Sequence, residues 1–120
     1  MLVVDAANVI GSRPTGWWRD RPGATRDFVA TVRSAVVAGR LSPPVTVVLE
    51  GRGRGGAEGS DVDGVAVVHA PGVGDDTIAT MAERHRGLVV VTADRGLAER
   101  VRAVGGAVVG PSWLLERLVG

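Results

Sequence analysis

The chain alternates between short runs of apolar residues and longer segments in which polar and apolar positions mix. Four valine-rich runs are apolar at nearly every position, and they cover residues 2–4, 45–49, 65–68 and 88–92. Continuous apolar runs of this length are typical of strands buried on both faces, as in a parallel sheet. A shorter run at residues 107–109 predicts a fifth strand.

The segments between these runs carry apolar residues at helical spacing. The predicted helices cover residues 25–38, 75–86 and 95–104, and a last one starts near Ser112. Gly39 and Gly87 directly follow two of these segments, as glycine often does where a helix ends. His85 falls on the inward face of the second helix, so we expect it to pack in the core. Strands that alternate with helices predict an α/β sandwich around a parallel sheet.

Two glycine-containing segments, 11–23 and 51–64, lack this periodicity and are predicted to be surface loops. The first combines adjacent tryptophans with arginines, and the second holds two more arginines. These residues are Arg13, Trp17, Trp18, Arg19, Arg21, Arg52 and Arg54. Aromatic and arginine side chains together can stack on bases and hold phosphates, so both loops are candidates for contact with RNA. Packing of the tryptophans against the fold, and plain solvation of the second loop, are the alternatives.

Acidic residues follow several of the predicted strands. Asp5, Glu50 and Asp94 come directly after, or within a few residues of, apolar runs, and Asp75 and Asp76 open a predicted helix just beyond another. Because the carboxyl ends of strands in an open parallel sheet share one edge, acids far apart in sequence should converge there. Each aspartate near a helix start could also be a simple helix cap. Several acids at one edge instead favour a site for a divalent metal.

The chemistry of such a cluster points to a hard cation. Two carboxylates about 4 Å apart repel by about 4 kcal/mol at an effective dielectric constant of 20, so the cluster needs protons, arginines or a metal. Oxygen-only ligands suit Mg²⁺ or Mn²⁺. These ions can activate water and steady charge on a phosphate during hydrolysis.

Composition narrows the class of protein further. The 120 residues are 45% hydrophobic, which is enough for one domain with one core. The absence of cysteine excludes disulfides and thiolate metal sites. No apolar run approaches the ~20 residues of a membrane span, so we expect a cytoplasmic protein without membrane contact. The net charge is +1, and all 14 basic residues are arginine, which excludes lysine chemistry and suits phosphate binding.

Four motifs, in order along the chain, resemble one family of nucleases. They are Leu2–Gly11 (LVVDAANVIG), Asp75–Ile78 (DDTI), Val89–Arg95 (VVVTADR) and Val108–Leu114 (VVGPSWL). The sequence thereby resembles the PIN-like nucleases, in particular the NYN domain family and its YacP-like bacterial ribonuclease branch. Each motif alone is short, but together they span nearly the whole chain.

The resemblance implies a three-layer PIN-like (Rossmannoid) sandwich with a five-stranded, mainly parallel sheet of order 3-2-1-4-5, formed by one domain over residues 1–120. It also implies hydrolysis of RNA phosphodiester bonds with bound Mg²⁺ or Mn²⁺. By motif, Asp5, Asp75 and Asp94 are the catalytic, metal-binding acids, and Asp76 is a fourth candidate. Asn8, Glu50 and Thr92 are expected to line the site, and Arg95 is expected to contact RNA.

Two departures from the family pattern leave other functions open. Gly96 stands where many NYN members have a further aspartate, and Glu50 stands where strand 2 often ends in aspartate. A module that binds RNA without cleaving it is therefore the main alternative. Another Rossmann-like phosphate enzyme is less well supported, because Ala7 replaces the second aspartate of a phosphoaspartate hydrolase and no lysine is present for a receiver domain. The sequence leaves open whether the chain is a monomer or a homodimer.

Overall fold

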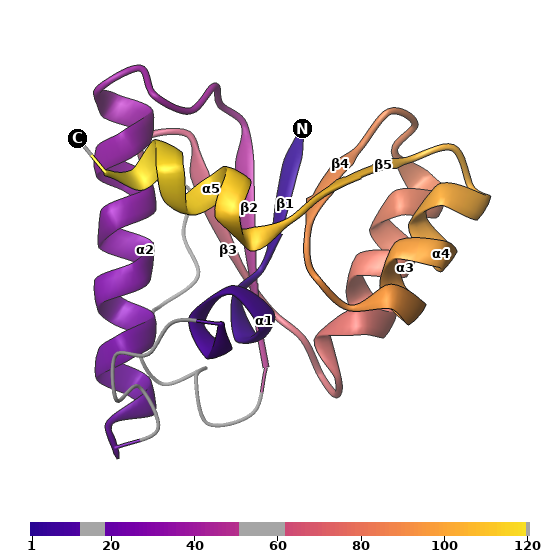
Figure 1. The fold of residues 1–120 in the computed structure, drawn as a ribbon, viewed down its shortest axis with the longest axis horizontal. Helices are drawn as coiled ribbons and strands as arrows, with labels where there is room; N and C mark the ends of the chain where they lie inside the picture. Colours follow the sequence, from indigo (N-terminus) through magenta and orange to yellow (C-terminus); the bar gives the residue numbers. More distant parts are fainter. Residues whose placement is uncertain (13–18, 51–61, 120) are drawn as a thin grey trace.

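The structure, a computed structural model, describes residues 1–12, 19–50 and 62–119. Its centre is a sheet of five strands in the order β3-β2-β1-β4-β5 (Figure 1). The strands are β1 (Leu2–Asp5), β2 (Val45–Leu49), β3 (Val65–His69), β4 (Val89–Val91) and β5 (Ala107–Val109). All four pairs of neighbouring strands run parallel. The expected sheet order and direction are therefore confirmed.

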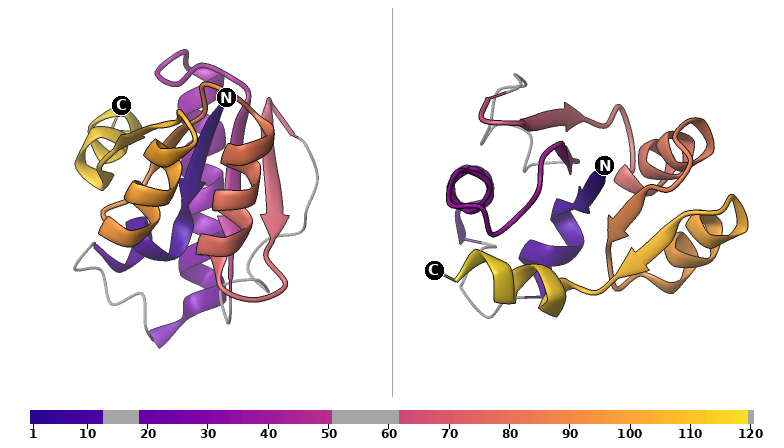
Figure 2. Two further views of the ribbon diagram at one scale, coloured as in Figure 1. Left: turned by 90° about the vertical axis from the view of Figure 1, so that its right-hand side faces the viewer. Right: turned by 90° about the horizontal axis from the view of Figure 1, so that it is seen from above.

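Helices cover both faces of the sheet and make three layers (Figures 1 and 2). They are α1 (Ala6–Gly11), α2 (Arg21–Val37), α3 (Gly74–Arg84), α4 (Arg95–Ala103) and α5 (Pro111–Leu118). One apolar cluster joins the sheet to α1, α2 and α5. A second cluster joins the opposite face to α3 and α4. The predicted α/β sandwich is confirmed.

The alternation of side chains along β1 shows why its run is continuously apolar. Leu2 and Val4 belong to the cluster under α2, whereas Val3 belongs to the cluster under α3 and α4. Successive side chains of a strand point to opposite faces, so a strand covered on both sides needs apolar residues at every position. The one polar residue of β1, Asp5, stands at the last position of the strand, at the carboxyl edge of the sheet.

Three features differ from the sequence-based expectations. The segment after β1 forms α1, a helix that was not predicted because six residues are too few to show a period. The next helix begins at Arg21 rather than Thr25, because the Asp20 carboxylate accepts a hydrogen bond from the Gly23 amide at 3.0 Å and caps it. The expectation for His85 was wrong: α3 ends at Arg84, and His85 is exposed just beyond it.

Among the helices of the described residues, none has the length and apolar character needed to cross a membrane.

Candidate active site

The order in which the chain adds strands to the sheet reverses between β1 and β4. From β1 the chain builds β2 and β3 outward on one side, and it then returns to place β4 and β5 on the other side. Ligands of open parallel sheets bind outside the carboxyl ends of the strands at such a switch point. Asp5 is the last residue of β1, and Thr92 directly follows β4, so both lie at this place.

Asp5 is the most buried acid of the described residues, with 5% of its surface exposed. The Thr92 hydroxyl donates a hydrogen bond to Oδ2 of Asp5 at 2.9 Å, and the same hydroxyl accepts one from the Asp94 amide at 3.1 Å. Burial raises the pKa of the Asp5 carboxyl from its ordinary 3.8 to about 6. Thr92 and the Asn8 amide act against this rise, whereas the charges of Asp75 and Glu50 add to it.

Asp75 lies in the first turn of α3, on a different element from Asp5. Burial is the main cause that raises the pKa of its carboxyl, and the negative charges of Asp94 and Glu50 raise it further. Arg100 partly opposes this effect. Acids from β1, the end of β2, α3 and the start of α4 therefore influence one another at one edge of the sheet.

Besides Asp5, three of the predicted site acids have partners within the protein. The Glu50 carboxylate accepts a hydrogen bond from the Gly74 amide at the start of α3. Asp94 accepts one from the Leu97 amide at 2.9 Å and caps α4. Asp76 forms an exposed ion pair with Arg100 at 3.0 Å. Capping is thus real for Asp94, but α3 begins at Gly74, so Asp75 and Asp76 lie inside its first turn and do not cap it.

The polar residues expected to line the site also hold its loops in place. The Asn8 side-chain carbonyl accepts a hydrogen bond from the Ala93 amide at 2.8 Å and links α1 to the loop after β4. Gly96 lies in the first turn of α4, and a Cβ atom there would come within 3.3 Å of Oδ1 of Asp94. A side chain at position 96 would therefore require the Asp94 carboxylate to shift by a few tenths of an ångström. The sequence did not point to Arg100, which lies in the second turn of α4 and has no signal in its spacing.

The chemistry of these acids suits a hard divalent cation. Every donor atom is a carboxylate oxygen, and a bound cation would offset the repulsion between the negative charges. Within residues 1–12, 19–50 and 62–119, however, no three Asp, Glu or His side chains are grouped closely enough to hold a metal ion. Mg²⁺ is often bound through one or two carboxylates, with water and substrate phosphates supplying the remaining ligands. Asp5 and Asp75 fit that smaller requirement, because no arginine of the described residues forms an ion pair with either.

The residues predicted to contact RNA are only partly covered by the structure. Arg13, Trp17, Trp18, Arg52 and Arg54 lie outside the described residues. Arg19 and Arg21 are exposed at the start of α2, and Arg95 is exposed at the start of α4. Of these three, Arg95 is the one that directly follows a predicted metal-binding acid.

The three layers and the sheet order 3-2-1-4-5 are those of a PIN-like fold. Comparison with solved structures finds the same fold in Rae1 (YacP) from Bacillus subtilis, with a TM-score of 0.73 and 20% identity over 98% of this chain and 72% of that chain. A single-residue mutant of Rae1 gives a TM-score of 0.68 and 19% identity, with the same coverage. No protein-family model and no curated protein matches the sequence. The resemblance to the YacP-like branch is thereby confirmed at the level of the fold.

Proposed function

We propose that this protein is a ribonuclease that hydrolyses phosphodiester bonds of RNA at the carboxyl edge of its sheet. The observation that carries the proposal is the placement of Asp5, a buried carboxylate with a raised pKa, beside the charge of Asp75 at the β1–β4 switch point. Strongly perturbed acids at such a position are typical of functional sites. The motifs shared with the YacP-like ribonucleases and the fold shared with Rae1 support the same function.

We further propose that Mg²⁺ or Mn²⁺ is the cofactor and that Asp5 and Asp75 hold it, with Asp94 close enough to add negative charge. Such an ion, when bound, would activate a water molecule and offset charge on the scissile phosphate. The proposal accounts for the raised pKa values of Asp5 and Asp75, because a bound cation would offset the burial and the neighbouring negative charges that raise them.

The chain's own residues would orient this pair of acids. Thr92 directs Oδ2 of Asp5 through its hydroxyl hydrogen, and it is itself held by the Asp94 amide. Glu50 binds the amide of Gly74 and so fixes the first turn of α3, where Asp75 lies. Both contacts join elements that are distant in sequence, so the site depends on the packed fold.

The test is cleavage of a labelled single-stranded RNA with Mg²⁺, Mn²⁺ or excess EDTA. Asp75→Asn should remove cleavage without unfolding the protein, because Asn is nearly isosteric and the Asp75 side chain makes no hydrogen bond to the part of the chain that the structure describes. Asp27→Asn, a change of an exposed acid on α2, is the matched control and should leave the rate unchanged. Cleavage that persists in EDTA and in the Asp75 variant would refute the metal mechanism.

A module that binds RNA without turnover is the second candidate. It is favoured by the lack of a group of three metal-binding side chains among the described residues and by Gly96. The same assay separates the two functions, because such a module would retain RNA binding in EDTA and would show no cleavage with either metal.

A further inference from the structure

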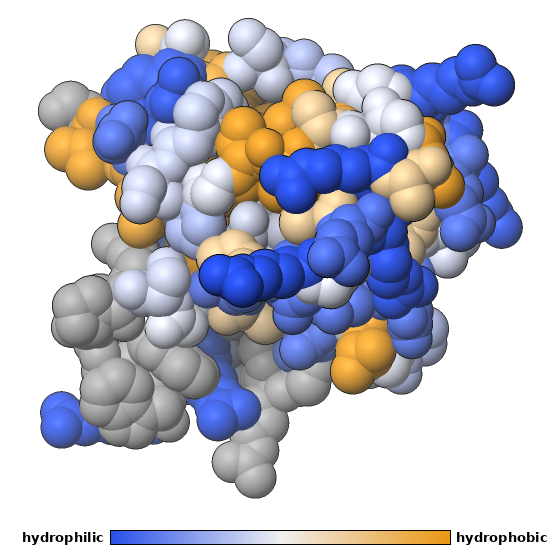
Figure 3. Space-filling view, turned by 45° about the vertical axis from the view of Figure 1, so that its right-hand side comes forward, coloured by the Kyte–Doolittle hydropathy of each residue, from blue (hydrophilic) through white to orange (hydrophobic). Residues whose placement is uncertain are grey.

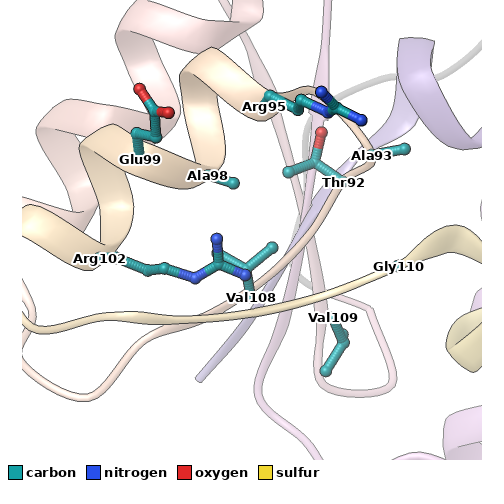
Figure 4. A pocket seen from close by; sticks show the side chains of 9 residues that line it. All are labelled: Thr92, Ala93, Arg95, Ala98, Glu99, Arg102, Val108, Val109 and Gly110. Carbon is teal, nitrogen blue, oxygen red and sulfur yellow. The ribbon is translucent and has the colours of Figure 1, made fainter.

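A pocket of about 400 Å³ lies next to the proposed active site, between α4 and the edge strand β5 (Figure 4). Its walls come from the end of β4, one face of α4 and the end of β5. Thr92 forms part of the wall, and its hydroxyl is the group that binds Asp5. The pocket therefore adjoins the carboxyl edge of the sheet but contains none of the proposed metal-binding acids.

Two arginines of α4 supply the positive charge in the wall of this pocket. Arg95 and Arg102 are seven residues apart, which is about two helical turns and a separation of ~10 Å along the axis. Figure 4 shows the Arg102 side chain lying across the pocket beside Val108 and the Arg95 guanidinium near Thr92. Glu99, the one acid in the wall, points away from both guanidinium groups (Figure 4).

The charges of these two arginines are not neutralised within the described part of the chain. The ion pair found there joins Arg100 to Asp76, on the side of α4 that faces α3. Neither Arg95 nor Arg102 has a carboxylate within ion-pair distance among the described residues. The space-filling view of this side of the molecule shows hydrophilic side chains lying across apolar surface (Figure 3). Exposed guanidinium groups beside a pocket are well suited to bind phosphate through paired N–H donors.

We propose that this pocket binds backbone phosphates of the RNA strand on one side of the cleaved bond, with Arg95 and Arg102 each contacting one phosphate. The inference rests on the proposed function. A strand with one phosphate at Asp5 and Asp75 must continue away from them. Among the described residues, a strand that runs toward β2 and α3 meets Glu50 and Asp76, of which Asp76 is paired with Arg100. A strand that runs toward α4 and β5 meets Arg95 and Arg102, so the charges of the described residues favour that direction.

The net charge of +1 means that the protein as a whole attracts RNA only weakly, so RNA affinity must come from the local arrangement of arginines. Binding should therefore depend on individual arginines and on salt. Each phosphate contact of a single strand contributes about 0.7 to the slope of log affinity against log salt concentration. Loss of both contacts should flatten that slope by about 1.4 and should weaken binding by roughly 25-fold at 0.1 M salt.

The experiment is a fluorescence anisotropy titration of a short, labelled single-stranded RNA in EDTA at several salt concentrations. It compares the wild type, the double variant Arg95→Gln with Arg102→Gln, and Arg84→Gln. Arg84 is another exposed arginine, in the last turn of α3 at the opposite end of that helix from Asp75, and its loss should leave the slope unchanged. A second double variant, Arg95→Lys with Arg102→Lys, keeps both charges and should keep most of the slope while binding less tightly. Thermal melts establish that all variants fold.

The outcomes distinguish this inference from the proposed function. A flattened slope in the glutamine variant, with slopes retained in the lysine and Arg84 variants, supports the phosphate path even if no metal restores cleavage. Equal slopes in the wild type and the glutamine variant overturn the path even if the wild type cleaves RNA. Failure of the wild type to bind RNA at any salt concentration would also overturn it.

Discussion

Replacement of Asp5 by Asn should make the protein more stable at neutral pH while removing its proposed activity. The pKa of Asp5 is about 6 in the folded chain, against an ordinary value of 3.8. Between these values the folded state binds a proton more readily than the unfolded state does, so stability falls as pH rises from about 4 to about 6. Above that window the ionised carboxylate opposes folding in full, because burial removes it from water.

The size of this effect follows from the pKa difference. A difference of about two between the folded and unfolded chain corresponds to ~3 kcal/mol at neutral pH. Asn cannot ionise, and its side-chain carbonyl can still accept the Thr92 hydroxyl. The new amide N–H groups need partners, and an unsatisfied buried donor costs about 1–3 kcal/mol. We therefore expect a net gain in the free energy of unfolding of about 0–2 kcal/mol at pH 7 and no gain near pH 4.

The measurement is urea unfolding followed by circular dichroism at pH 4, 5, 6 and 7 in EDTA, for the wild type and Asp5→Asn. Asp27→Asn is the control, since its exposed side chain should give no pH-dependent difference from the wild type. A variant that is less stable than the wild type at pH 7, or a gain that does not shrink toward pH 4, would refute the reasoning from burial.

Three further predictions concern the same edge of the sheet. Thr92→Val removes the donor to Asp5, so the pKa of Asp5 should rise further, and the pH profile of any RNA cleavage should shift upward. Gly74→Ala would place a Cβ atom 2.9 Å from the Glu50 carboxylate, so it should displace Glu50 and reduce cleavage, with a change in the melting temperature as a check on folding. In a thermal melt, Mn²⁺ at 100 times its Kd should stabilise the wild type by about 2.7 kcal/mol. Asp75→Asn should lose this stabilisation, and a gain that survives the substitution would place the ion elsewhere.

Most of the sheet could be predicted because burial on both faces leaves a local mark. The strand at Val45–Leu49 is buried at every position and is apolar at every position except Thr46, and its predicted limits match those of β2. The convergence of the acids also followed from topology, since any residue just after a parallel strand lies at the same edge. The helix α1 escaped prediction because it is too short for a periodic pattern and because Ala6 and Val9 are its only buried residues.

The contacts inside the site could not be predicted from spacing. Thr92 and Asp5 are 87 positions apart, and no local pattern says which hydroxyl will bind a given carboxylate. The interaction of Glu50 with the Gly74 amide depends on a glycine that exposes its backbone, and this became visible only in the folded chain. Arg102 had no assigned role, because its relation to Arg95 depends on a pocket formed with β5.

Because Asp5 ends the central strand, the site depends more on the number of residues in β1 than on which aliphatic residues the strand contains. Val3 faces α3 and α4, and by alternation Asp5 faces the same side. Deletion or insertion of one residue in β1 would turn the carboxylate toward α1 and α2, away from Asp75 and Thr92. Exchanges among Val, Ile and Leu in this strand would leave the carboxylate where it is. We therefore expect sequences of this type from different organisms to vary freely in which aliphatic residues they use here, and to keep a fixed number of residues between the start of β1 and Asp5.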